Sequence, residues 1–294
     1  MDAPARADAK RGQHFHALIR SREAVWAMVI GATIAILAGG AVQDVRVALG
    51  GPLLVVLLVV VWAYRRATRM AENDFFAALA PTLGLTYMVS GAYRPVTPLL
   101  AAGDRQKLEH VMEGPLFGAG GGPPCVVGHF TYETHHRASI GSDSEVERFS
   151  PHPFTVCAID LGMPIARYRG VYLRERISGL GLQHDWLDRA PKPRAIELES
   201  ERFNQIYDLR AGVDQDELAM RELFSPSLVD WLSNHPLHPG FECKAGTLCV
   251  FIRGHEGSAG KLTMLHEAAR ELARRLSRQV EQDAHFSAAG QTIL

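Results

Sequence analysis

The sequence predicts an α+β protein in which an N-terminal transmembrane helical hairpin precedes a cytosolic domain of mostly antiparallel strands with packed helices. Three observations predict this. Two long apolar runs stand near the start of the 294-residue chain. Short segments that alternate in the β manner, separated by Gly and Pro, fill the middle of the chain. An amphipathic helical stretch lies near its end.

The two apolar runs are long enough to cross a bilayer. Residues 24–42 are 19 uncharged residues, and residues 47–64 are 18. At about 1.5 Å per residue the shorter run spans roughly 27 Å, close to a hydrocarbon core of about 30 Å. Residues 53–61 are apolar on every helical face, whereas a core helix usually carries a polar stripe. Only "QDVR" separates the runs, so the sequence predicts a hairpin.

Charge predicts the orientation of this hairpin. Residues 1–69 hold nine Lys or Arg and four Asp or Glu, and the remaining residues hold 22 and 28. Eight of the nine basic residues flank the hairpin, and Arg46 alone lies in its turn. The positive-inside bias therefore predicts a two-pass protein of the inner (cytoplasmic) membrane with both termini cytoplasmic. A signal peptide cut near Ala41 is the alternative, and the stop-transfer flank "RRATR" would still keep the rest in the cytosol.

Three parts follow from this topology: a basic cytoplasmic segment at 1–23, the hairpin at 24–64 and the cytosolic domain at 65–294. Within the first apolar run, small residues recur every fourth position and so share one helical face. Such a face favours close helix packing in a bilayer. We expect it to meet the second run, and a homo-oligomer built on the same face is the alternative. The packing residues are Ala27, Gly31, Ala35 and Gly39.

The cytosolic domain begins with a short helix over 70–84, ended by Pro81 and Gly84. Residues 115–124 form a loop dense in Gly and Pro, and residues 140–153, rich in Ser and acids, are predicted to be a mobile loop. Strand-like segments lie between and after these loops. Their ranges are 85–93, 125–137, 154–162, 170–177, 195–200 and 203–212.

The last third of the chain alternates helices with one hairpin. A helix over 214–223 opens at Asp214 or Asp216, and a second begins at Ser225 with Pro226 in its first turn. Residues 241–253 form a hairpin that turns at Ala245 and Gly246. In the helix over 261–282, apolar residues recur at threes and fours. Some six or seven strands with packed helices result, and a small pleckstrin-type barrel is one form that this pattern allows.

Residues 198–232, "LESERFNQIYDLRAGVDQDELAMRELFSPSLVDWL", carry a family resemblance. They resemble the signature of the bacterial membrane family Domain of Unknown Function 3137, as do the two-span layout and "GLTY" at 84–87. Asn204 stands where that family tends to have an acidic residue, and residues 115–194 match weakly. The resemblance implies an architecture and no mechanism, because the family has no established activity. The matching places are held by Glu199 and Glu201, Phe203, the strand to Leu209, Asp216 with Arg221, and Ser225 with Pro226.

The sequence assigns no catalytic, cofactor-binding or metal-binding residue. "HEAAR" places Arg270 where a zinc-protease helix needs a second His. Cys243 and Cys249 have five residues between them, too many for the usual structural zinc spacing, although His235 and His238 stand nearby. The glycines at 118–122 lack the Lys and Ser or Thr of a phosphate loop. "HDW" at 184–186 has no recognisable nucleophile beside it, and the four cysteines are expected to be free thiols.

These observations favour a membrane-anchored cytosolic binding or scaffolding domain without a catalytic role. The expected partners are the lipid bilayer and another protein on the cytosolic side. Nucleic acid is excluded as a partner because residues 70–294 carry a negative balance of charge. A membrane-tethered enzyme, with a site assembled from dispersed His and Asp residues, is the alternative. Transport by the spans is disfavoured because neither carries an ionisable side chain apart from the terminal Tyr64.

Overall fold

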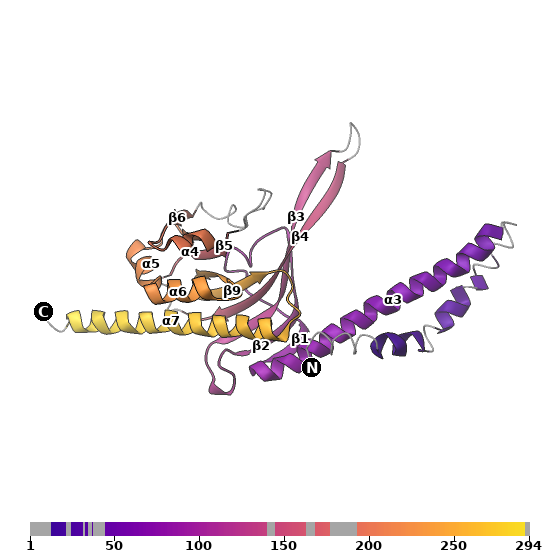
Figure 1. Ribbon diagram of the computed structural model, residues 1–294, viewed down its shortest axis with the longest axis horizontal. Coiled ribbons are helices and arrows are strands. Elements are labelled where there is room, and N and C mark those ends of the chain that lie inside the picture. Colours follow the sequence, from indigo (N-terminus) through magenta and orange to yellow (C-terminus); the bar gives the residue numbers. More distant parts are fainter. Residues whose placement is uncertain are drawn as a thin grey trace. The chain divides into compact units, whose positions relative to one another are not determined.

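The computed structural model describes residues 13–21, 25–31, 33–34, 37, 45–139, 145–162, 168–176 and 193–291. The chain forms two compact units, Met1–Leu79 and Ala80–Leu294 (Figure 1). We describe each unit by itself.

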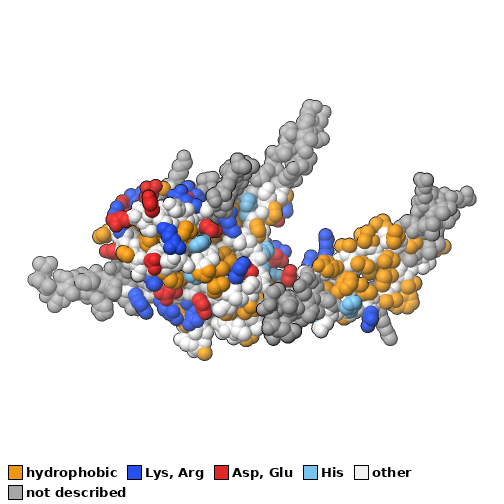
Figure 2. All heavy atoms as spheres, in the orientation of Figure 1, with side chains coloured by type: hydrophobic (Ala, Val, Ile, Leu, Met, Phe, Trp, Pro, Cys, Tyr) orange, Lys and Arg blue, Asp and Glu red, His pale blue; other side chains and the backbone are white. Residues whose placement is uncertain are grey.

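The first unit is dominated by one long helix, α3 (Val45–Leu79). One helical stretch, Gly51–Leu83, is long and apolar enough to cross a membrane. Only 11% of its most apolar 18-residue segment is buried. Large side chains such as Leu53, Leu57 and Leu58 are exposed on it, and hydrophobic side chains gather over this helix in Figure 2. The structure therefore contains one candidate span, which includes residues 51–64 of the second apolar run.

Helix α3 continues without a break through the residues after this run. The helix expected over 70–84 is present as the last part of α3, because residues 65–79 contain neither Gly nor Pro to interrupt the helical hydrogen bonds. The helix ends where the sequence predicted, at the 3-10 turn η1 (Ala80–Leu83) that contains Pro81. Gly84 follows with a φ of 74°, a left-handed conformation that suits glycine.

The second unit is an α+β domain built on one nine-stranded antiparallel sheet, as the fold class predicted. The strand order is β1-β2-β3-β4-β9-β8-β5-β7-β6. No pairing among the described residues joins β1 to β6, so the described strands form an open order, and a closed pleckstrin-type barrel is not shown. The strands are β1 (Thr86–Ser90), β2 (Arg105–Pro115), β3 (Pro124–Ser139), β4 (Glu145–Asp160), β5 (Val171–Glu175), β6 (Arg194–Ile196), β7 (Tyr207–Ala211), β8 (Gly240–Lys244) and β9 (Thr247–Arg253).

Three local predictions are corrected by the structure. Strand β2 was missed, since a bulge between Glu109 and Met112 breaks its alternation. Residues 145–153, expected in a mobile loop, belong to β4 because they pair with the far half of β3, and the long β3-β4 hairpin projects from the sheet in Figure 1. Residues 203–206, expected at the start of a strand, belong to helix α4 (Glu201–Ile206), which begins where the Ser200 hydroxyl accepts a hydrogen bond from the Phe203 N–H.

The remaining helices begin and end close to their predicted positions. Helix α5 (Glu217–Leu223) starts at Asp216, whose carboxylate accepts hydrogen bonds from two backbone N–H groups. Helix α6 (Pro226–Asn234) starts after Ser225, although the hydroxyl of this residue makes no capping hydrogen bond. The hairpin of β8 and β9 turns at Ala245 and Gly246, both with positive φ. Helix α7 (Ala259–Gln291) extends beyond the expected range at both ends.

Both faces of the sheet are covered. Helix α7 packs on β4 and β9 with its predicted stripe, and Leu262, Leu265, Ala269, Leu272 and Leu276 are all buried. On another part of the sheet Leu99 and Leu100, from the segment before β2, join a core with Phe130, Phe154 and Phe251. The backbone N–H of Leu99 donates to the buried Glu242 carboxylate over 2.8 Å. This bond fixes a loop to β8.

Candidate functional site

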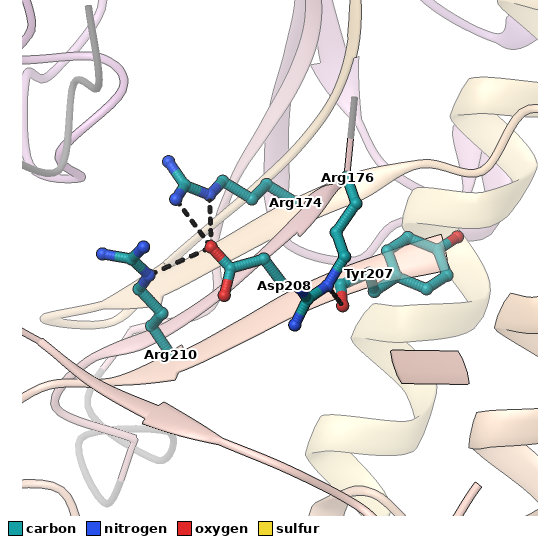
Figure 3. Close-up of polar contacts among 5 residues, drawn as sticks. All are labelled: Arg174, Arg176, Tyr207, Asp208 and Arg210. Carbon is teal, nitrogen blue, oxygen red and sulfur yellow. Dashed lines mark hydrogen bonds and ion pairs between the residues drawn. The ribbon is translucent and has the colours of Figure 1, made fainter. Parts of the chain in front are cut away.

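An arginine cluster surrounds one carboxylate on strands β5 and β7 (Figure 3). The register places Arg174 opposite Asp208, and Arg210 lies two residues along the same strand, so all three side chains share one face. A single Asp208 oxygen, Oδ2, accepts from Arg174 Nε at 2.8 Å, Arg174 Nη2 at 2.6 Å and Arg210 Nε at 3.0 Å. Arg176 Nε donates instead to the Tyr207 carbonyl oxygen at 2.8 Å.

The cluster keeps Asp208 ionised. Burial raises the pKa of this carboxyl, but the hydrogen bonds and charges of Arg174 and Arg210 outweigh it and lower the pKa below its ordinary value. The Arg174 and Asp208 side chains are 17% and 15% exposed, so little water screens the pair. A carboxylate held in this way is a poor proton acceptor. The cluster therefore suits a structural tie between β5 and β7 better than general acid or base chemistry.

A cavity lies beside the edge strand β6. Its volume is about 660 Å³, and the described residues that line it lie within 194–233. Figure 1 shows α4, α5 and α6 grouped at this end of the sheet. The apolar part of the wall consists of Ile196, Leu198, Phe224, Pro226 and Val229. We call this cavity the β6 groove.

Charges of both signs rim the β6 groove. Glu217 binds Arg194 at 3.1 Å and Arg221 at 3.2 Å, and these contacts are solvent exposed. The hydrogen bond from Arg221 and the charge of Arg194 lower the pKa of Glu217. The side-chain amide of Asn204 stabilises the wall at Leu198. It donates to the Leu198 carbonyl at 2.7 Å and accepts from the Leu198 N–H at 3.2 Å. The groove thus combines an apolar floor with a polar rim.

Strand β6 also offers a hydrogen-bonding edge. It pairs with β7 through Arg194, Ala195 and Ile196, and it stands at the end of the strand order. Within the described part of the chain its other edge has no strand partner. An unpaired edge presents backbone donors and acceptors at the spacing that an extended peptide needs.

The residues considered for metal binding are not brought together. The hairpin register puts Cys243 opposite Leu248, and Cys249 opposite Glu242, so the two thiols lie on opposite faces of the sheet. His238 Nδ1 lies 3.6 Å from the Glu175 carboxylate, while burial lowers the pKa of His235. In the ranges that the structure describes, no group of three or more His, Cys, Asp or Glu residues has a metal-binding arrangement. The "HDW" stretch at 184–186 lies outside the described residues.

Two side-chain clusters were not predicted from the sequence, because each joins residues that are distant in the chain. Cys125 and Cys157 lie on one face of β3 and β4 beside His266 of α7. A hydrogen bond from Cys157 lowers the pKa of Cys125 to about 6, with burial opposing and His266 adding to the shift. Their exposures are 1%, 0% and 2%, so no substrate has access to them. This trio is part of the core under α7.

The second such cluster consists of histidine rings. His129 stacks on His255 with ring centroids 4.5 Å apart, and His110 meets His129 edge to face at 5.6 Å. Hydrogen bonds hold the rings: His129 Nε2 to the Glu256 carbonyl at 3.0 Å, and His255 Nε2 to the Thr131 hydroxyl at 2.9 Å. The alternation of residues along β3 places His129 and Thr131 on one face, and this is the part of the cluster that the sequence can indicate.

In the first unit, only half of the predicted packing face can be described. A Cβ atom added to Gly31 would come within 2.6 Å of Val55 Cγ1 on α3, so the two segments are in close contact there. Ala27 is exposed. Ala35 and Gly39 lie outside the described residues.

Contacts with α3 also extend to the helical residues 13–19. His14 Nε2 lies 2.9 Å from the Asp74 carboxylate, and the rings of Phe15 and Tyr64 meet edge to face at 6.2 Å. Gly31 also contacts Val55. Across these three pairs, the residue number rises in the N-terminal segments while that of the partner on α3 falls. The N-terminal segments therefore lie antiparallel to α3.

Comparison with known proteins adds a single weak likeness. No protein-family model matches the chain, so the family suggested by residues 198–232 stays a prediction. No curated protein matches it. A solved structure that does match is the crystal structure of the mycobacterial trehalose monomycolate transport factor A, TtfA, with 12% sequence identity and a TM-score of 0.44. The match covers 70% of this chain and 93% of that chain.

Proposed function

We propose that this protein is a membrane-anchored binding or scaffolding domain that holds an extended segment of a partner protein along β6 on the cytosolic side. The β6 groove carries the proposal. Its volume of about 660 Å³, its apolar floor and the adjacent strand edge together match recognition by strand addition, in which backbone hydrogen bonds supply affinity and side-chain pockets supply specificity.

A two-span hairpin in the inner membrane is the anchor that we propose. Exposed leucines on α3 would face lipid, because burying such side chains is favourable. The antiparallel contacts of His14, Phe15 and Gly31 with α3 support a hairpin within one chain. The excess of Lys and Arg on both outer flanks supports cytoplasmic termini.

A binding role is favoured over catalysis because several Asp and His side chains are already held in ion pairs. Some of the described Asp and His residues that a tethered enzyme could use are held in separate pairs, Asp208 with arginines and His238 with Glu175. Asp74 pairs with His14 in the other unit. A general base needs a free lone pair near a nucleophile, which these arrangements do not supply.

The test uses the full chain in mild detergent, captured from native membranes, with the retained proteins identified by mass spectrometry. We expect a stable protein partner with the unmodified chain, and its loss with Ile196→Asp or Leu198→Asp, which place a charge on the groove floor. Leu218→Asp is the matched control, because Leu218 is 62% exposed on α5 and outside the groove.

The groove variants must keep the melting temperature of the unmodified chain when they lose the partner, because this excludes unfolding as the cause. Retention of the partner by both groove variants would contradict the proposed docking site. Retention of a small metabolite by the unmodified chain, displaced by the same variants, would favour a ligand pocket over a protein interface.

A further inference from the structure

A second groove lies on α3, where the apolar run gives way to arginines. Its volume is about 630 Å³. Its walls stand at helical spacings of three and four residues, so they form one continuous face that changes from apolar to basic along the helix. They include Leu58, Val61, Trp62, Arg65, Arg66 and Arg69.

The charges of this groove are all positive. The Arg66 guanidinium lies 5.6 Å from the centre of the Trp62 ring, a cation–π distance. Among the described residues, no carboxylate lines the groove and none of the three arginines forms an ion pair. The nearby Asp74 is engaged by His14. Three guanidinium groups therefore face outward without a counter-charge from the described residues.

The length of this groove along the helix axis is comparable to the thickness of the lipid headgroup layer. From Trp62 to Arg69 the helix rises about 10 Å, comparable to the polar layer of roughly 5 to 8 Å on each side of the hydrocarbon core. Trp side chains favour this boundary, and Arg side chains extend from it toward phosphates. Leu58 and Val61 would then lie beside acyl chains while the arginines lie at phosphate level.

We propose that this groove binds the headgroup of an anionic phospholipid. Guanidinium groups bind phosphate oxygens in a bidentate manner, and the apolar part of the groove accommodates the start of the acyl chains. The inference rests on the proposed membrane anchor. It adds a lipid preference to that anchor, since a zwitterionic lipid carries a compensating cation in its headgroup.

The experiment compares the lipids retained by the full-length protein. The protein is reconstituted in nanodiscs of phosphatidylcholine doped with phosphatidylglycerol, released in mild detergent, and analysed by native mass spectrometry. We expect enrichment of bound phosphatidylglycerol over the doped fraction, and a fall of roughly fivefold in that enrichment for each of Arg65→Gln, Arg66→Gln and Arg69→Gln. The three exchanges are also combined in a triple groove variant. The charge-matched control replaces three exposed arginines of the second unit, Arg94, Arg169 and Arg278, by Gln.

The possible results distinguish failure of the lipid site from failure of the membrane anchor. Equal enrichment in the triple groove variant and the control would overturn the lipid site while leaving the anchor intact. Release of the unmodified protein from membranes by alkaline carbonate would overturn the anchor and this inference together. Loss of the bound lipid on addition of inorganic phosphate alone would show that the arginines form a simple phosphate site, and would also overturn the inference.

Discussion

Arg174 and Asp208 face each other across β5 and β7, and the guanidinium reaches one carboxylate oxygen through both Nε and Nη2. Arg210 donates to the same oxygen. One carboxylate oxygen thus accepts hydrogen bonds from two arginines, as Figure 3 shows.

Replacement of Asp208 by Asn should destabilise the protein by about 1 to 3 kcal/mol at pH 7, because two half-buried guanidinium groups would lose their charged acceptor. The folded pKa of Asp208 is lowered, so its contribution is present above the unfolded pKa of about 3.9 and is lost as pH falls through the folded pKa. Melting temperatures of both proteins measured from pH 7 to pH 3 should therefore converge in acid. A difference that stays constant over this range would contradict the assignment.

Leu272 lies on the buried stripe of α7 with 1% of its surface exposed. Leu272→Asp should unfold the second unit, because an unpaired buried carboxylate costs several kcal/mol against a typical total stability of about 5 to 15 kcal/mol. Circular dichroism of the solubilised protein measures the loss, and the exposed neighbour Arg274→Asp is the control. Native-like melting of Leu272→Asp combined with loss of a partner would show that the stripe is an interface.

Gly31 allows α3 to approach because no side chain stands between its backbone and Val55. Gly31→Leu should therefore separate the two segments and lower the melting temperature in detergent, and the added Val55→Ala exchange should restore part of it. A disulfide crosslinking assay from Ile34→Cys in native membranes tests the alternative, since Ile34 is 61% exposed. Efficient dimers that vanish with Gly31→Leu would favour a homo-oligomer over the internal hairpin.

The four cysteines are buried and unbridged. Burial raises the pKa of Cys243 to about 12, and both burial and Glu242 raise that of Cys249. We expect alkylation of the native protein to be slow and four thiols to react in denaturant, with a melting temperature unaffected by a chelator. One equivalent of zinc released on thiol modification would show a metal site.

Cytoplasmic termini are predicted by the basic flanks of the apolar runs. Reporter fusions after Gln43 and after Leu294 should give opposite results, with periplasmic activity only from the first. The reverse pattern would place the β6 groove outside the cytosol and contradict the proposed partner class.

The sequence by itself determined the features that arise from local patterns. The apolar run of α3, the start of α5 at Asp214 or Asp216, the turn at Ala245 and Gly246 and the leucine stripe of α7 each depend on residues a few positions apart. Propensity, capping and hydrophobic periodicity act at that range, so one sequence suffices to recognise them.

Tertiary structure alone decided which distant residues meet. The alternation of a strand shows the two faces but not the neighbouring strand, so the pairing of Arg174 with Asp208 and the placement of Cys125 beside Cys157 could not be predicted. Residues 145–153 became a strand because β3 supplied hydrogen-bond partners for their backbone, against their Pro and Ser content. The β6 groove likewise exists only after α4, α5 and α6 pack around one sheet edge, because a cavity depends on how separate segments fill space.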